Sequence, residues 1–271
     1  MKVAIDQLAA KLESALGTGA VESNSRTLAS YAVDGKFPSI LCAPGDPEQV
    51  SAALRICAEA DASVVPWGGG TAIGLGNIPR RANVVIEMKR LNGLIEHDDA
   101  NLTASAQAGM RVAALQNILG QRNQFLAIDP PCPGRATIGG LAADNSNGPR
   151  RLLYGGVRDL VIGMKIVLAN GQQIKAGGKV VKNVAGYDMC KLFVGSIGTL
   201  GVITEVTFKL APIPESAATL VAYGPLSQGL RLVEELSQSP LLPVAVAILS
   251  TDVSKATNIA LEMPSVAVWA E

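Results

Sequence analysis

Apolar residues recur at helical spacing in the first part of the chain. Residues 5–16 place apolar side chains three or four positions apart, which predicts an amphipathic helix, and Gly17 follows as its C-terminal cap. The same spacing over residues 50–58 predicts a second helix. The run SVVPW, residues 63–67, then predicts a strand that leads into a glycine-rich loop.

Strand patterns dominate from residue 84 onward. Short apolar runs, or apolar positions that alternate with polar ones, predict strands at 84–88, 102–109 and 200–212. A helix is expected over residues 112–120, with Gly120 as its stop. The pair Asn170-Gly171 lies between two extended segments, which is a strong signal for an antiparallel hairpin.

The chain beyond residue 212 returns to a mixed pattern of helix and strand. It reads, in order, as a strand at 219–223, a helix at 226–236, a strand at 244–249 and an extended piece that ends at Trp269. We therefore expect an α+β fold in three parts: a first subdomain over 1–83, a larger antiparallel-sheet subdomain over 84–212, and a partial or reduced α+β cap over 213–271.

Charge and hydropathy remove several classes of partner. The chain has 271 residues with 23 basic and 23 acidic side chains, so it has no overall field to hold nucleic acid or an anionic membrane surface. Charged residues or glycine interrupt every apolar run before it reaches membrane-spanning length. Asp6, Lys11 and Glu13 interrupt the N-terminal apolar pattern, unlike a signal peptide. We expect a cytoplasmic protein with no transmembrane segment of its own.

The cysteines and the single histidine exclude further kinds of chemistry. Cys42, Cys57, Cys132 and Cys190 are scattered with no C-x-x-C pair, which is typical of reduced thiols and argues against zinc or iron–sulfur ligation. His97 is the only histidine, so no mechanism can use two histidines of this chain. It lies in a polar segment, and we expect it to be a solvated turn residue.

The stretch VVPWGGGTAIGLGN, residues 64–77, holds five glycines directly after a predicted strand. Bare backbone of this kind suits a positive φ or the close approach of a ligand such as a phosphate. A nucleoside-triphosphate loop is excluded because no lysine follows Gly70. The dinucleotide fingerprint G-x-G-x-x-G also fails, since the sixth position from Gly68 is Ile73. From this loop alone, a flexible turn between strands remains an alternative.

Two later stretches again combine glycine with small side chains. They are residues 130–159, PPCPGRATIGGLAADNSNGPRRLLYGGVRD, and residues 182–210, KNVAGYDMCKLFVGSIGTLGVITEVTFKL. Small residues let a flat ligand lie against the main chain, and Thr137 adds a hydroxyl group. The three stretches together indicate one ligand site better than any one of them does.

Three motifs in these stretches resemble a known family. They are P-W-G-G-G-T at 66–71, P-G-x-x-T-I-G-G-x-x-A-x-N at 133–145 and G-S-x-G-T-L-G-V-I-T at 195–204. In this order and spacing they resemble the PCMH-type FAD-binding domain of the vanillyl-alcohol oxidase / p-cresol methylhydroxylase superfamily. Within it, residues 182–210 look most like the FAD-binding E subunit type of bacterial glycolate oxidases. The resemblance covers residues 31–212.

The resemblance implies a cofactor, FAD, and a set of binding residues. The first motif would wrap the pyrophosphate with the main chain of Trp67, Gly68, Gly69, Gly70, Thr71 and Ala72. The second begins at Pro133, brings Thr137, Gly139 and Gly140 to the pyrophosphate and ribitol, and places Ala143, Asn145 and Gly148 near the isoalloxazine edge. Ile203 would meet the adenine by backbone hydrogen bonds.

Two departures from the family pattern shape the expected chemistry. Members with covalent flavin often carry a histidine in the first loop, where this chain has Trp67, so we expect FAD to be bound noncovalently. Cys132 lies near the position of a flavin-linked cysteine in other members, but its spacing differs, and we interpret it as a small buried residue. Residues 213–271 contain no histidine, so no catalytic base is named.

The resemblance also implies a reaction and partners. We expect an FAD-binding subunit of a glycolate oxidase-type complex that oxidises glycolate, a small 2-hydroxy acid, to glyoxylate and passes electrons to a membrane quinone. Its partners would be a homologous FAD-containing catalytic subunit and an iron–sulfur subunit, which could hold it peripherally at the inner membrane. The alternatives are a self-sufficient FAD-dependent 2-hydroxyacid dehydrogenase seen as a fragment, and a flavin fold kept as a noncatalytic scaffold.

An independent activity would need a cation for the substrate carboxylate. The cap offers only Arg231 and Lys255, and Arg231 lies on the polar face of a predicted helix. Arg150, Arg151 and Arg158 lie closer to the flavin motifs and are the candidates for that cation.

Overall fold

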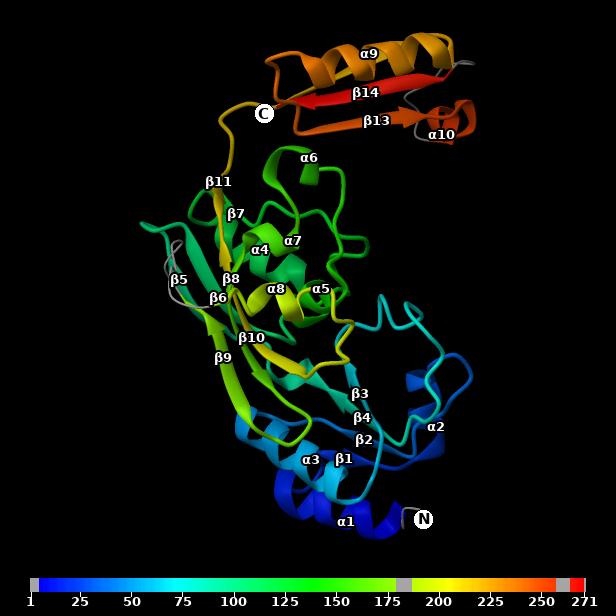
Figure 1. The fold of residues 1–271 in the computed structure, drawn as a ribbon, viewed down its shortest axis with the longest axis vertical. Coiled ribbons are helices and arrows are strands. Elements are labelled where there is room, and N and C mark those ends of the chain that lie inside the picture. Colours follow the sequence, from blue (N-terminus) through cyan, green and yellow to red (C-terminus); the bar gives the residue numbers. More distant parts are fainter. Residues whose placement is uncertain (1–4, 179–186, 257–263, 271) are drawn as a thin grey trace.

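The computed structural model describes residues 5–178, 187–256 and 264–270. These residues form three successive units that follow one another along the long axis of the molecule (Figure 1). Helices are combined with sheets that are mostly antiparallel, which confirms the expected α+β class. No helix of the described part combines the length and the apolar run needed to cross a bilayer.

The first unit packs two helices against a four-stranded sheet. The helices are α1 (Ile5–Leu16) and α3 (Pro47–Glu59), and the strands, in sheet order, are β1 (Val21–Glu22), β2 (Ile40–Cys42), β4 (Val84–Glu87) and β3 (Val64–Trp67). β2, β4 and β3 are parallel, as expected when a helix connects neighbouring strands. Asp46 caps α3 by accepting a hydrogen bond from the Gln49 amide at 2.7 Å, and Pro47 occupies the first turn.

Three short helices complete the first unit. They are α2 (Ser25–Leu28), η1 (Ala29–Tyr31) and η2 (Met88–Arg90). The expected division at residues 83 and 84 is corrected here, because β4 pairs with β2 on one side and with β3 on the other. A short apolar strand that is buried on both faces has the same sequence pattern in either sheet. The pattern therefore could not show to which sheet β4 belongs.

The second unit is a five-stranded antiparallel sheet covered by short helices. Its strands, in sheet order, are β5 (Leu94–Asp98), β6 (Thr103–Gln107), β10 (Val202–Lys209), β8 (Val161–Val167) and β9 (Gln173–Gly177). Its helices are α4 (Val112–Gly120), α5 (Ile138–Asp144), α6 (Arg151–Tyr154), α7 (Val157–Leu160) and α8 (Cys190–Phe193). β10 lies in the middle of this sheet although it is the last of its five strands in the sequence.

The expected hairpin is confirmed. β8 and β9 pair antiparallel from Val167 opposite Gln173, and Gly171 takes a φ of 82° in the turn. A further short pair, β7 (Gln124–Phe125) with β11 (Ala211–Pro212), closes the end of this unit.

His97 lies in β5 rather than in a turn, which corrects the expectation from the sequence. It pairs with Ala104 of β6, and its Nε2 lies 2.9 Å from Oε1 of Gln124. The polar residues around it are typical of a turn, but an edge strand with one solvent-exposed face has the same composition.

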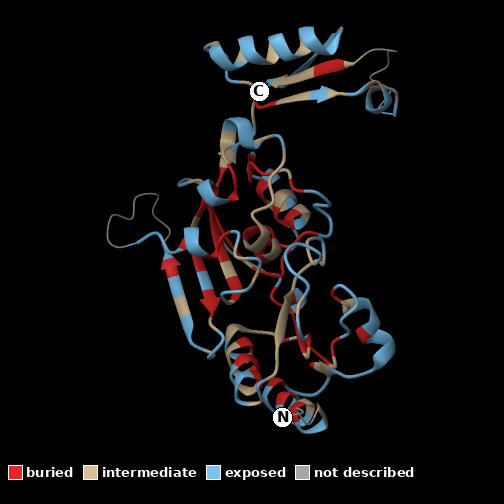
Figure 2. Cartoon of the chain, turned by 45° about the vertical axis from the view of Figure 1, so that its right-hand side comes forward, coloured by how far each residue is buried: buried red, intermediate tan, exposed pale blue. Residues whose placement is uncertain are grey.

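The third unit is a three-stranded antiparallel sheet with one long helix. Its strands, in sheet order, are β12 (Ala218–Tyr223), β14 (Ser265–Ala270) and β13 (Ala245–Leu249), and its helices are α9 (Leu226–Gln238) and α10 (Thr251–Ala256). α9 lies on one face of the sheet, and none of its residues is buried. Buried residues instead concentrate in the first two units (Figure 2).

Candidate functional site

Three segments that are far apart in the sequence meet at one cavity between the first and second units. They are the glycine loop after β3, the helix α5, and the turn that leads into β10. The empty volume between them is about 720 Å³, including space open to solvent. The central place of β10 in its sheet explains the meeting, because its first residues reach the opening between the units.

Eleven of the fourteen expected site residues line this cavity. They are Trp67, Gly68, Gly69, Gly70, Thr71, Ala72, Thr137, Gly139, Gly140, Ala143 and Ile203. Residues that the sequence analysis did not name also line it: Pro66, Ile73, Met88, Ala108, Asp144, Ile197, Gly198, Gly201 and Val202. Most of the additional residues adjoin the three motifs or belong to them, so the motifs themselves were the signal.

The other three expected residues do not line the cavity. Pro133 is exposed, and its carbonyl accepts a hydrogen bond from Ala113 of α4 at 3.0 Å. Asn145 is the C-cap of α5, in the left-handed conformation with a φ of 55°. Gly148 packs so closely on Asp129 that a Cβ would lie 2.2 Å from its Oδ1. These positions shape the loop that follows α5.

The glycine loop packs main chain against main chain. A Cβ built on Gly69 would lie 1.9 Å from the carbonyl oxygen of Arg135, and one on Gly68 would lie 2.3 Å from Oγ1 of Thr137. Gly70 has a φ of +67°, which side chains rarely adopt. Gly68 and Gly69 are therefore required by the contact between the first and second motifs, and Gly70 by its positive φ. All three leave main chain rather than side chains on this wall.

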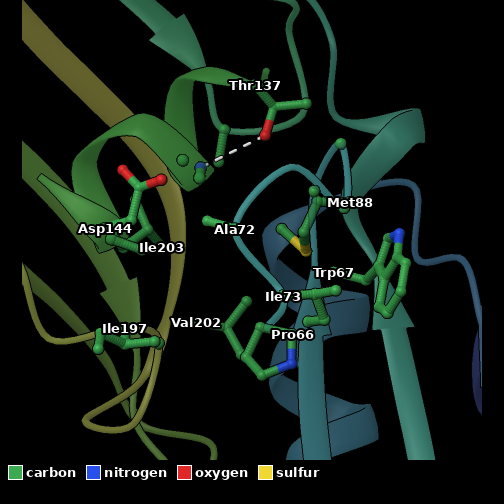
Figure 3. Close-up of a pocket in the computed structure, with 18 of the residues that line it drawn as sticks. Pro66, Trp67, Ala72, Ile73, Met88, Thr137, Asp144, Ile197, Val202 and Ile203 are labelled. Carbon is green, nitrogen blue, oxygen red and sulfur yellow. Dashed lines mark hydrogen bonds between the residues drawn. The ribbon is translucent and has the colours of Figure 1, made fainter. Parts of the chain in front are cut away.

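The helix α5 is held at both ends by groups of the site. Thr137 is its N-cap and accepts a hydrogen bond from the Gly140 amide at 3.3 Å (Figure 3). At the other end, the amides of Gly195 and Ile197 donate to the carbonyls of Ala142 and Ala143, at 3.0 and 2.7 Å. The third motif thus satisfies carbonyl groups that the end of a helix leaves unpaired.

Trp67 is fixed by a small network in the first unit. Its ring meets the ring of Tyr31 edge-on, with centroids 5.0 Å apart. The Tyr31 hydroxyl donates to Oε1 of Glu87 at 2.6 Å, and Nζ of Lys89 lies 2.5 Å from Oε2 of the same carboxylate. Burial, followed by the hydrogen bond and the negative charge of Glu87, raises the pKa of Tyr31 well above its ordinary value. Tyr31 therefore stays a neutral donor.

Asp144 is the one ionisable side chain among the described residues that line the cavity. It is half-buried, and burial raises the pKa of its carboxyl group above the ordinary value although hydrogen bonds from Ser146 and from the backbone of Asp144 itself act in the opposite direction. The amide and hydroxyl of Ser146 donate to Oδ1 and Oδ2 at 2.8 Å each. In the view of Figure 3, Asp144 and Ile203 both lie on the side of the cavity opposite Trp67.

A second recess adjoins the cavity and carries basic side chains. It shares the wall formed by Trp67, Gly68, Gly69 and Thr137 with the first cavity, and its cationic residues are Lys89, Arg111 and Arg135. All three cations are exposed. These residues were not singled out in the sequence, because lone basic residues outside the motifs give no signal of their own.

Arg150 has a structural position rather than a free one. Its guanidinium group lies over the ring of Phe125 at 5.0 Å and over the ring of Trp269 at 4.5 Å. It therefore joins the second unit to the third, which argues against its expected role as the cation that binds a substrate carboxylate. Arg151 and Arg158 are exposed.

The cysteines are free and do not line the cavity. Cys132 is exposed, with a φ of 54°, so its interpretation as a buried residue was wrong. Burial raises the pKa of Cys42 to about 12 and that of Cys57 to about 11, so both thiols are protonated and unreactive at neutral pH. No group of three or more metal-ligating side chains occurs in the part of the chain that the structure describes.

The fold and the cavity define the class of protein: a flavin-binding domain of the PCMH type. A family model described as an FAD binding domain (FAD_binding_4) matches residues 38–177. The chain belongs to this family of FAD-binding domains, and its cofactor is FAD. The matched range includes the first two motifs, and the third follows it in the turn that leads into β10 and in the first residues of that strand.

Individual relatives agree with this assignment. Glycolate oxidase subunit GlcD of Bacillus subtilis (strain 168) is 39% identical over 214 residues, which cover 79% of this chain and 46% of the relative. A D-lactate dehydrogenase of Anaerostipes hadrus is 32% identical over 226 residues, covering 82% and 47%. Glycolate oxidase subunit GlcE of Escherichia coli (strain K12) is 36% identical over 157 residues, covering 58% and 45%. The chain spans about half the length of these relatives.

A solved structure shows the same fold. p-Cresol methylhydroxylase with substrate bound superposes with a TM-score of 0.82 at 19% identity, over 98% of this chain and 60% of that chain. The likeness extends into the third unit, since the match covers nearly the whole chain.

Proposed function

We propose that this chain is the FAD-binding part of an enzyme that oxidises a small 2-hydroxy acid, with glycolate to glyoxylate as its particular reaction. The observation that carries the proposal is the convergence of the three glycine-bearing segments on one cavity between the two sheets. The relatives named as glycolate oxidase subunits and D-lactate dehydrogenase support the substrate class.

The residues of the cavity fit FAD, bound noncovalently. The glycine loop and α5 offer main chain and small side chains along an extended surface, which suits a pyrophosphate and a flat ring system. No histidine, cysteine or tyrosine is found among the described residues that line the cavity, so no side chain there is suited to a covalent link. When bound, FAD accepts the hydride equivalent that leaves the carbon bearing the hydroxyl group.

The individual roles expected of the lining residues belong to the same proposal. The main chain of residues 67–72 binds the pyrophosphate, Thr137, Gly139 and Gly140 bind the adjoining ribitol, and Ile203 faces the adenine. The exposed position of Pro133, and those of Asn145 and Gly148, favour a supporting role in the loop after α5 over direct contact in this cavity.

Substrate oxidation also needs a base for the hydroxyl proton and a cation for the carboxylate. His97, on β5, makes a hydrogen bond with the side chain of Gln124. The guanidinium group of Arg150 lies over the rings of Phe125 and Trp269. We therefore propose that activity requires a homologous FAD-containing catalytic subunit, together with an iron–sulfur subunit that passes electrons to a quinone-linked acceptor. These partners would hold the chain peripherally at the inner membrane.

A second candidate is a self-sufficient FAD-dependent 2-hydroxyacid dehydrogenase of which this chain is a part. It is favoured by the likeness to a D-lactate dehydrogenase about twice as long. In this case Lys89, Arg111 and Arg135 are the candidates for binding a carboxylate, because they line the recess that shares a wall with the flavin cavity.

Anaerobic mixing separates these readings. The FAD-loaded chain is mixed with glycolate or D-lactate, with and without the partner subunits, and the visible flavin absorption is followed. Bleaching that requires the partners supports the complex, whereas rapid bleaching of the isolated chain, lost in Arg111→Ala or Arg135→Ala, supports the second candidate. A purified chain that takes up no FAD would contradict both and leave a noncatalytic scaffold.

A further inference from the structure

The position of Asp144 makes its charged carboxylate unfavourable for the stability of the fold. It lies in the last turn of α5, where the negative end of the helix disfavours a carboxylate, and it is half-buried. Burial is the largest influence on its pKa, and no cation of the described chain contributes to that pKa. A stable fold alone would favour a neutral residue at this position.

The local hydrogen bonds leave acceptor capacity unused. Ser146 donates one hydrogen bond to each carboxylate oxygen. A carboxylate has two oxygens and about four acceptor sites in total. Asp144 can therefore accept further hydrogen bonds from a ligand, and it is already held in one orientation by Ser146.

Charge decides which part of FAD can lie beside it. The pyrophosphate of FAD is anionic, and a carboxylate in a water-poor cavity repels it. The glycine loop is the part of the cavity wall that offers bare main chain, and Figure 3 shows Asp144 on the opposite side of the cavity from Trp67. The group beside Asp144 must be neutral and must carry hydrogen-bond donors.

We propose that Asp144 accepts hydrogen bonds from sugar hydroxyl groups of bound FAD and thereby fixes the direction in which the cofactor lies in the cavity. Carboxylates recognise ribose hydroxyls in the same way in dinucleotide-binding folds. The hydroxyls belong either to the ribose of the adenosine half or to the ribityl chain of the flavin half. The inference rests on FAD binding by this cavity, not on the substrate.

The first test compares FAD affinity and apoprotein stability. Asp144→Asn keeps the size of the side chain and removes its charge, and Asp144→Ala removes the acceptor. Asp159→Asn is the matched control, because Asp159 also accepts a local main-chain bond, from Gly156 at 2.9 Å, but does not line the cavity. We expect FAD to bind about 10-fold or more weakly to both Asp144 variants, since hydrogen bonds to charged groups are strong, and normally to the control.

The stability of the apoprotein distinguishes binding from folding. Asp144→Asn should have an apoprotein melting temperature equal to or above that of the wild type, while its FAD affinity falls. If both Asp144 variants bind FAD as tightly as the wild type, the inference about Asp144 is overturned. The proposed function would still stand in that case, because it requires only that the wild type binds FAD. A loss of affinity that follows an equal loss of apoprotein stability would also overturn it.

ADP and FMN distinguish the two sources of hydroxyls. A deficit of Asp144→Asn for ADP alone assigns the ribose, and a deficit for FMN alone assigns the ribityl chain. Equal affinity of the variant and the wild type for both ligands would contradict the proposal, because each hydroxyl source would then be independent of Asp144.

Discussion

Some glycines of the site are required by packing, and others have open space around them. Gly68 and Gly69 are small because Thr137 and the main chain of Arg135 occupy the space that their side chains would need. Gly74 lies a few positions further along, and a Cβ there would meet nothing within 4 Å. The sequence pattern identified the loop but could not separate these cases, because a glycine required by packing and a dispensable one look alike in the sequence.

This difference predicts the effect of single alanine substitutions. Gly69→Ala should lower the free energy of unfolding by about 1–3 kcal/mol, since backbone must move to relieve the contact, and FAD affinity should fall with it. Gly74→Ala in the same loop should be neutral. Urea denaturation of the apoproteins measures the first quantity and flavin titration the second. A stable Gly69→Ala variant would show that the two motifs separate easily. Gly69→Asp should lose FAD altogether.

Trp67 offers a spectroscopic prediction. The chain has only two tryptophans, Trp67 in the cavity and Trp269 in β14. FAD binding should therefore quench mainly the fluorescence of Trp67. In Trp67→Phe the quenching should be largely lost, whereas Trp269→Phe should keep it. Equal quenching in the two variants would place the flavin away from the glycine loop.

Asp144 makes apoprotein stability depend on pH. Its pKa is raised in the folded state, so protonation favours the fold, and the favourable contribution is lost as the pH rises through the folded-state pKa. Asp144→Asn should therefore gain stability over the wild type at neutral pH, and the gain should disappear in acid. Thermal melts of both apoproteins across this range measure the difference. Sequence reasoning passed over Asp144 because its neighbours in the motif, and not the acid, carry the family resemblance.

At the scale of elements, the order of helices and strands was predictable but their pairing was not. Helical spacing gave α1, α3 and α4, and the Asn-Gly pair gave the hairpin of β8 and β9. Neither the placement of β4 in the first sheet nor the insertion of β10 between β6 and β8 follows from local pattern, because both depend on contacts between distant segments.

The short helix η1 supports the cavity from outside. Tyr31 at its end links β4 to the ring of Trp67 through the hydrogen bond to Glu87, whose exposed fraction is 7%. Tyr31→Phe should cost about 1–3 kcal/mol of unfolding free energy, because a buried acceptor loses its donor. Tyr187→Phe, at a side chain that is 96% exposed, is the control and should have no effect. Chemical denaturation of both variants measures the difference.

At the scale of the whole molecule, Arg150 links the second unit to the third. Arg150 lies between the rings of Phe125 and Trp269, which belong to the second and third units. Cation–π contacts of this kind contribute about 0.5–2 kcal/mol each. Arg150→Ala should therefore increase protease cleavage between residues 212 and 218, while the exposed Arg151→Ala should not. Unchanged cleavage in Arg150→Ala would show that other contacts hold the unit.

The central position of β10 has a consequence for how the protein is made. During synthesis, β6 and β8 emerge long before the strand that lies between them, so their facing edges stay unpaired until residue 209 is available. Such non-local pairing slows folding and leaves strand edges open to aggregation. A chain stopped after residue 200 should therefore aggregate and take up no flavin in a translation extract. A chain stopped at residue 217 should fold and bind flavin. Flavin uptake would therefore show when the five-stranded sheet is complete.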